Sequence, residues 1–272
     1  MIKFNYLLGL LLICLVSTSA TTSESERGVP VNYIRTAEEF ITAVKNKDNT
    51  EVFIKTFEYC KLEQLANQVA TDDQRLAFWI NLYNAYIQVI LTKDPGLYKD
   101  RNAFFKKKQI NIGGKMFSFS DIEHGILRRS QNEYFLGYIL KFFPSKPEKM
   151  FRVDKVDWRI HFALNCGAKS CPPIRVYYVD EVRDQLELAA RTFLSQFTKY
   201  DPIKKSAKVT ALFTWFQGDF GGYESIKKIL VRYKLIPDTK TELVTETYDW
   251  TLKLANFADK KKKKKVSDPS NN

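Results

Sequence analysis

The sequence predicts an α+β fold, in which helices pack on a small, mostly antiparallel sheet within a single domain. Long stretches repeat apolar residues every three or four positions, as amphipathic helices do, while shorter stretches alternate apolar and polar residues, as strands do. The 272 residues are 44% hydrophobic and 14% aromatic, which is enough for one sizeable core. No repeat or linker requires a second domain.

Two helices are predicted first. Thr36 and Glu39 have the spacing of a capping box, so a helix should follow to about residue 45. Apolar residues near helical spacing predict a second helix over residues 52–69. This helix contains Cys60, which we interpret as a small core residue rather than a nucleophile, because its neighbours are apolar.

The strongest helical pattern opens at Asp72 and ends before Asp94. Its apolar residues recur at intervals of three and four: Leu76, Trp79, Ile80, Tyr83, Ile87, Ile90 and Leu91. Asn81 and Asn84 interrupt the pattern, and because asparagine is a poor helix former, their side chains should hydrogen-bond to other groups. Either they tie the helix to a neighbouring backbone, or Asn84 faces a functional site.

A hairpin is predicted over residues 109–119, with its turn at a pair of glycines. Ser120 and Glu123 then have the spacing of a second capping box, which places His124 near the start of a helix. The positive end of a helix disfavours a protonated imidazole, so His124 is suited to act as a neutral acceptor or ligand. The alternative is a surface histidine beside Glu123.

Residues 159–173 hold one of the two histidines and two of the four cysteines. Apolar and polar residues alternate over residues 159–164, which predicts a half-buried strand that carries His161. A glycine-containing turn with Cys166 follows, and two prolines after Cys171 prevent a helix from running through. A histidine beside a thiol on such a turn is a candidate site for chemistry.

The last third of the chain mixes helices and strands. Helices are predicted over residues 179–199 and 223–233, a strand over residues 208–212, and a further strand or edge segment over residues 247–252. An aromatic, glycine-rich segment lies between the first strand and the second helix.

The sequence predicts four parts in order. Residues 1–20 have a positive start, a short apolar run and small residues before a cleavage point, as a secretory signal peptide does. Residues 21–30 are a polar, disordered spacer, residues 31–257 the globular domain, and residues 258–272 a lysine-rich disordered tail. We therefore expect the protein to be secreted or to lie in the lumen of the secretory pathway.

The net charge is +12, but it is placed unevenly. Without Lys3 and the six lysines of residues 260–265, the remaining chain carries +5. This mildly basic body does not predict a nucleic-acid partner. We expect an unknown small-molecule or peptide ligand, and the lysine run from Lys260 to Lys265 could touch anionic surfaces weakly.

Several blocks of the sequence resemble the signatures of a domain-of-unknown-function family, the one numbered 547. They are residues 73–85, 121–128 and 159–173, with later blocks at residues 212–220 and 248–250. Together they run across most of residues 60–250. The resemblance implies a domain, but the family name implies no activity.

The first functional hypothesis is a cysteine-dependent hydrolase or acyltransferase. A thiol nucleophile needs a base and a group that orients this base. Cys166 is the better nucleophile, because a glycine follows it and the next backbone N–H groups could bind an oxyanion. His161 or His124 would be the base, with Asn84 or Asn81 orienting it. There is a weak analogy to papain-like and transglutaminase-like thiol hydrolases, whose nucleophile begins the central helix.

The second hypothesis is a non-enzymatic binding or scaffold module. In an oxidising compartment Cys166 and Cys171 could form a structural disulfide that removes the nucleophile and leaves Cys60 as the odd thiol. Trp215 and Asp219 are interpreted as packing and turn residues, with lining of a binding pocket as the alternative.

A metal site is the remaining alternative. Two histidines and two cysteines are the right ligand types for zinc, but the Cys-x4-Cys spacing is wide for such a site. No metal and no cofactor is predicted.

Overall fold

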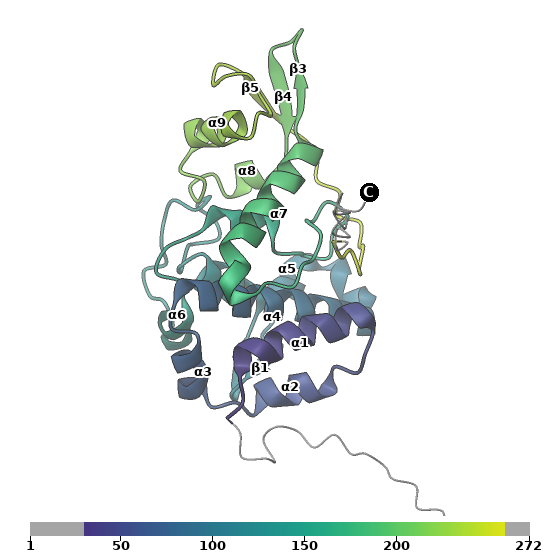
Figure 1. The fold of residues 1–272 in the computed structure, drawn as a ribbon, viewed down its shortest axis with the longest axis vertical. Helices are drawn as coiled ribbons and strands as arrows, with labels where there is room; N and C mark the ends of the chain where they lie inside the picture. Colours follow the sequence, from purple (N-terminus) through teal and green to yellow (C-terminus); the bar gives the residue numbers. More distant parts are fainter. Residues whose placement is uncertain (1–29, 259–272) are drawn as a thin grey trace, which may run out of the picture. The chain divides into compact units, whose positions relative to one another are not determined.

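The structure is a computed structural model that describes residues 30–258. In the unit that begins at Asn32, the described residues form about ten helices and two small sheets, a mixed α+β fold (Figure 1). Most of the predicted signal peptide, spacer and lysine tail lies outside these residues. None of the helices that the structure describes is long and apolar enough to cross a bilayer.

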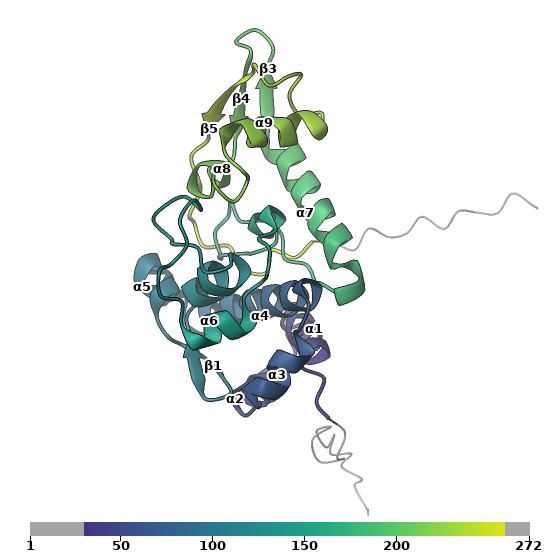
Figure 2. The same cartoon turned by 90° about the vertical axis from the view of Figure 1, so that its left-hand side faces the viewer.

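Helix α4 (Asp72–Lys93) is the central element, and its predicted start and end are confirmed. Thr71 caps it in a reciprocal capping box with Gln74, and Asp94 follows its last turn. Nearly every side chain from Leu76 to Gln88 is buried, so the helix is covered on all sides. Helix α1 (Tyr33–Asn46) packs along it (Figures 1 and 2).

The predicted start of the first helix was wrong. Helix α1 begins at Tyr33 because the side chain of Asn32 accepts the backbone N–H of Arg35, so that Asn32 is the cap in place of Thr36.

The helix predicted over residues 52–69 is interrupted. It consists of α2 (Glu51–Glu58) and α3 (Leu62–Gln68), with Cys60 in the break between them. Cys60 is buried, and burial raises the pKa of its thiol to about 11. This environment agrees with the interpretation of Cys60 as a core residue.

The predicted hairpin is confirmed. Strands β1 (Ile110–Ile112) and β2 (Lys115–Phe117) pair antiparallel. Gly113 and Gly114 join them with φ of 57° and 73°, a left-handed pair of residues that suits a two-residue hairpin turn. Helix α5 (Arg101–Lys106) and the short helix η2 (Pro95–Lys99) connect α4 to this hairpin.

The strand predicted over residues 159–164 was wrong. The segment forms a 3₁₀ helix, η4 (Trp158–Phe162), because the side chain of Asp157 accepts the backbone N–H of Arg159 and caps it. The alternation was misleading because residues 160–164 are all buried, the positions expected to face solvent included, and only Arg159 is partly exposed.

The C-terminal half contains helix α7 (Val182–Phe197), which the short helix η5 (Val179–Glu181) precedes. Helices α8 (Leu212–Trp215) and α9 (Tyr223–Arg232) follow, and the predicted helix over residues 223–233 is confirmed. Buried side chains of α7, α8 and α9 form one cluster with Phe162 of η4. The Phe162 ring lies 5.3 Å from that of Phe193. This cluster fixes η4 against the C-terminal half.

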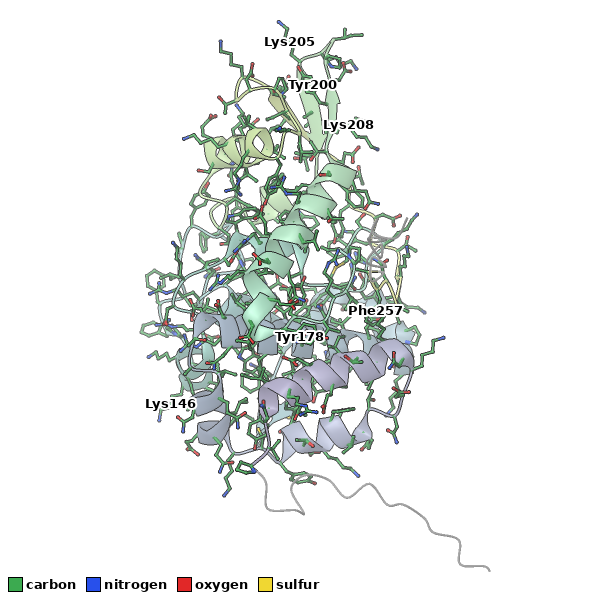
Figure 3. All side chains as sticks on the ribbon, viewed as in Figure 1. Lys146, Tyr178, Tyr200, Lys205, Lys208 and Phe257 are labelled. Atoms are coloured by element: carbon green, nitrogen blue, oxygen red, sulfur yellow. A yellow bond between two sulfur atoms is a disulfide. The ribbon has the colours of Figure 1, made fainter. Side chains whose placement is uncertain are left out.

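The described strands form two small sheets rather than the one predicted, and most of their pairings are antiparallel, as predicted. Strands β3 (Lys199–Asp201) and β4 (Ser206–Val209) pair antiparallel, whereas β4 and β5 (Glu242–Thr245) pair parallel. Figure 3 labels Tyr200, Lys205 and Lys208 on the β3–β4 hairpin.

Of the strand or edge segment predicted over residues 247–252, no regular strand is formed. This segment is extended and makes a single bridge, from Leu252 to Ala168, because its backbone bonds go to the turn after Cys166.

Candidate functional site

A pocket of about 210 Å³ collects side chains from segments far apart in the sequence. Its lining includes Tyr83, Glu123, His124, His161, Cys166 and Trp215. Four of these are residues that the sequence analysis proposed for the site: both histidines, one cysteine and the tryptophan. The structure therefore brings these four residues together, although they come from separate segments of the sequence.

His161 is held by Asp219. Its Nε2 lies 2.8 Å from Oδ2 of Asp219, and its ring stacks on Phe216 with 3.9 Å between centroids. Burial lowers the pKa of His161, although Asp219 opposes the shift, so the imidazole is neutral at pH 7. Because an ionised carboxylate only accepts, Nε2 carries the proton and Nδ1 is the acceptor atom.

Arg128 holds Asp219 in turn. Its Nε and Nη2 lie 2.5 and 3.2 Å from the two carboxylate oxygens, and both side chains are almost fully buried. Burial alone would raise the pKa of Asp219, but the hydrogen bonds from His161 and Arg128 outweigh it and lower this pKa. Asp219 is therefore ionised. Asp219 thus binds both Arg128 and His161, whereas the sequence indicated a residue of a turn.

His124 lies on the other side of Arg128. It belongs to a π-helical segment, η3 (Asp121–Leu127), and its Nδ1 lies 2.6 Å from Nη1 of Arg128. Burial and then Arg128 lower the pKa of His124 well below its ordinary value. A guanidinium only donates, so Nδ1 accepts and Nε2 carries the proton. The prediction of a neutral His124 agrees with this shift, but burial and Arg128 are its causes rather than a helix end.

Glu123 and Tyr83 are pocket residues that sequence reasoning missed. Tyr83 Oη lies 3.4 Å from Oε2 of Glu123. Burial raises the pKa of Glu123 to about 6, against the opposing effects of Arg128 and Tyr83. The sequence signal was present, because Glu123 precedes His124, but Glu123 was interpreted only as part of a cap.

The two cysteines on the turn lie together. Their Sγ atoms are 2.17 Å apart and their Cα atoms 6.2 Å apart, so the pair sits at disulfide distance. Cys166 is half-buried and lines the pocket, whereas Cys171 is 3% exposed. Tyr248 Oη lies 3.6 Å from Cys166 Sγ, and no histidine nitrogen forms a hydrogen bond with this sulfur among the described residues.

Hydrogen bonds hold the turn between the cysteines. Asn165 donates its side-chain N–H to the Pro172 carbonyl at 2.7 Å and accepts the Gly167 N–H at 3.0 Å. Gly167 has φ of +86°, a left-handed conformation that favours glycine. Lys253 donates its backbone N–H to the Gly167 carbonyl, so the extended C-terminal segment clamps the turn.

Asn81 and Asn84 both tie α4 to neighbouring backbone. Asn84 donates to the Ala163 carbonyl at 2.9 Å and accepts the Asn165 N–H at 2.8 Å. Asn81 makes the same two kinds of bond to Tyr177. Neither lines the pocket, but Asn84 fixes the backbone between His161 and Cys166.

One wall of the pocket is aromatic. The Trp215 ring lies 4.9 Å from that of Tyr248 and 5.5 Å from that of Trp250, and Arg101 lies over Trp250. Trp215 comes from α8, and the other two aromatic residues come from the extended segment that clamps the turn. Trp215 is thus a pocket residue, which the sequence analysis had held as the alternative.

The candidate zinc site is not assembled. Within residues 30–258 no group of three histidine, cysteine or acidic side chains is placed to hold a metal ion. The two histidines instead bond Arg128 and Asp219.

Comparison with known proteins yields one match. A family model with the description "Protein of unknown function, DUF547" matches residues 67–194. Searches of curated proteins and of solved structures found no match. The matched range contains both histidines, Arg128 and the cysteine pair, whereas Asp219 and the aromatic wall lie beyond it.

Proposed function

Residues 67–194 of this chain are a DUF547 family domain, and we propose that its pocket is the site of a cysteine-dependent hydrolase or acyltransferase. The observation that carries this proposal is the contact between His161 Nε2 and Asp219, in a pocket that Cys166 also lines. These residues are of the three types that a thiol enzyme uses: nucleophile, base and orienting group.

His161 is the better base of the two histidines. Its Nδ1 is the acceptor atom, because Nε2 donates to Asp219. His124 accepts at Nδ1 from Arg128 and carries its proton on Nε2, so Nε2 is its donor atom. We assign His161 to take the thiol proton and His124 to donate to the oxygen on which charge develops.

The reaction proceeds in two steps. Cys166 Sγ bonds to the carbonyl carbon of an acyl substrate, its proton passes to His161 Nδ1, and the leaving group departs with that proton. Water or another acceptor nucleophile then attacks the thioester carbon and gives its proton to His161 Nδ1. The bond between Cys166 Sγ and the acyl carbon breaks, and Cys166 takes that proton from His161 as the acyl product leaves. The backbone N–H groups expected to bind the oxyanion are occupied, since Gly167 donates to Asn165 and Ala168 to Cys171 Sγ.

The analogy to papain-like and transglutaminase-like hydrolases extends only to this set of side chains. In those enzymes the nucleophile begins the central helix, and here α4 has no cysteine.

A specific observation favours a second candidate function. The Cys166–Cys171 pair sits at disulfide distance, and a bonded Cys166 has no thiolate to attack with. The domain would then be a binding or scaffold module in which the disulfide and the aromatic wall shape a pocket for a small molecule or peptide.

Compartment and partners belong to the same proposal. The apolar start of the sequence supports secretion or the secretory-pathway lumen, where a disulfide is stable. The mildly basic body supports a small-molecule or peptide ligand over a nucleic acid, with weak contact of Lys260 to Lys265 to anionic surfaces.

The test uses the full chain, treated with a thiol-reactive probe at neutral pH before and after reduction, and then with activated esters. The enzyme hypothesis requires labelling and ester turnover that are lost in Cys166→Ala and retained in Cys60→Ala. His161→Gln should retain labelling after reduction but lose most turnover. An intact mass that shows the Cys166–Cys171 bond, with no turnover after reduction, establishes the second candidate.

A further inference from the structure

Cys171 Sγ lies among three hydrogen-bond donors. The backbone N–H groups of Cys166 and Ala168 lie 3.1 and 3.3 Å from it, and Tyr248 Oη lies at 3.2 Å. A disulfide sulfur is a poor acceptor, whereas a thiolate accepts strongly. This surrounding is therefore better matched to Cys171 as a thiolate than to Cys171 in a purely structural disulfide.

The two sulfur atoms differ in access. Cys166 is half-buried and lines the pocket, so a molecule in the pocket meets this residue first. Cys171 is 3% exposed and does not belong to the lining. In an exchange reaction the accessible sulfur is attacked and the shielded sulfur leaves.

The turn is held by hydrogen bonds as well as by the sulfur–sulfur bond. Asn165 spans it through Pro172 and Gly167. The backbone of Ser170 donates to Asp249 and that of Lys253 to Gly167. None of these hydrogen bonds uses a sulfur atom, so each is available to hold the turn after reduction.

We propose that the Cys166–Cys171 pair undergoes reversible thiol–disulfide exchange with an external thiol that enters the pocket. The incoming thiolate attacks Cys166 Sγ and forms a mixed disulfide with it. The bond between the two cysteines breaks, and its electron pair goes to Cys171 Sγ, where the three donors stabilise the thiolate. A second external thiolate then attacks the external sulfur of the mixed disulfide, which forms an external disulfide and releases the Cys166 thiolate. Alternatively, the Cys171 thiolate attacks Cys166 Sγ, expels the external thiolate and restores the original bond.

This exchange reaction requires the Cys166–Cys171 disulfide, and it shares Cys166 with the proposed function. It adds redox regulation to that function, because Cys166 cannot act as a nucleophile in the disulfide and an external thiol frees it. It requires no acyl chemistry. The two can therefore fail separately.

The test uses the full chain in a Cys60→Ala background and glutathione as the external thiol. With oxidised glutathione, the Cys171→Ser variant should form a mixed disulfide at Cys166 at least tenfold faster than Cys166→Ser forms one at Cys171, by peptide mass mapping. Equal rates, or faster reaction at Cys171, overturn the assignment of the attacked sulfur.

The role of the donors is tested with Tyr248→Phe, which removes one hydrogen bond to the leaving sulfur. Reduction of the disulfide by glutathione should slow about three- to tenfold, and alkylation of reduced Cys171 should require higher pH. Tyr86→Phe is the matched control, because the Tyr86 hydroxyl is buried and bonds no group within the described structure. If both variants are reduced at the wild-type rate, the proposal is wrong.

Intact mass separates this inference from the proposed function. A chain that exchanges with glutathione but turns over no ester refutes only the hydrolase. A chain that has no Cys166–Cys171 bond as isolated, yet turns over esters through Cys166, refutes only the exchange.

Discussion

His161 Nε2 lies 2.8 Å from Oδ2 of Asp219, across 58 positions of sequence, and both side chains are almost completely buried. Arg128 closes the arrangement from a third segment by binding both oxygens of the same carboxylate. The carboxylate thus fixes the tautomer of His161, while the guanidinium balances its charge.

Removing the charge of Asp219 should destabilise the protein. Asp219→Asn leaves the Arg128 guanidinium buried without a counter-ion, which should lower the free energy of unfolding by about 3 to 5 kcal/mol. Chemical denaturation measures this loss. The control Asp249→Asn breaks the exposed pair with Lys169 and should leave the midpoint nearly unchanged. Equal denaturation midpoints for the two variants would contradict a stabilising, buried ion pair between Arg128 and Asp219.

Glu123 should make stability depend on pH. Its folded pKa of about 6 lies above the ordinary value of 4.5, so the folded state retains a proton that the unfolded state releases. Stability should therefore fall by about 2 kcal/mol as pH rises from about 4.5 through 6, and stay at the lower level above that range.

Denaturation of Glu123→Gln at pH 4.5 and pH 7.5 checks this pH dependence. Between these values the variant should lose about 2 kcal/mol less stability than the wild type, because glutamine has no proton to release. Glu39→Gln, at an exposed position of α1, is the control and should follow the wild type. A wild type and Glu123→Gln variant with parallel pH profiles would show that Glu123 is not perturbed.

Asn84 and Asn81 offer a matched comparison. Each side chain makes two buried bonds to backbone, so replacement by alanine should cost about 2 to 4 kcal/mol in both cases. Only Asn84→Ala loosens the backbone next to Cys166. Reduced Cys166 should therefore change its rate of alkylation in Asn84→Ala and keep it in Asn81→Ala. The same rate in all three proteins would argue against a positioning role for Asn84.

Gly167 should not tolerate a side chain. At φ of +86° any Cβ is strained, and here it would lie 3.1 Å from Leu91 Cδ1. Gly167→Ala should cost about 1 to 3 kcal/mol, measured by thermal or chemical denaturation. Gly114→Ala has a similar φ of +73° but open space at its Cβ, so it should cost less. If Gly114→Ala cost more stability than Gly167→Ala, contact of the new Cβ with Leu91 would not explain the loss at Gly167.

Elements with local causes could be predicted from the sequence. Helix α4 begins at a capping box and ends at Asp94, and the β1–β2 hairpin turns at two glycines, so each signal lies within a few residues of its effect. The same local logic failed for residues 159–164, because alternation predicts a strand only when alternate residues face solvent, and here residues 160–164 are all buried.

By itself, the sequence identified α4, the first hairpin, a DUF547 domain and four of the residues that line the pocket: both histidines, Cys166 and Trp215. Only the tertiary structure decided how they are connected, with Asp219 on His161, Arg128 between the histidines and Glu123 beside Tyr83. The physical reason is the separation along the sequence between the interacting residues. Caps and turns are set by neighbouring residues, whereas a buried charge or neutral imidazole depends on partners that folding brings in from distant segments.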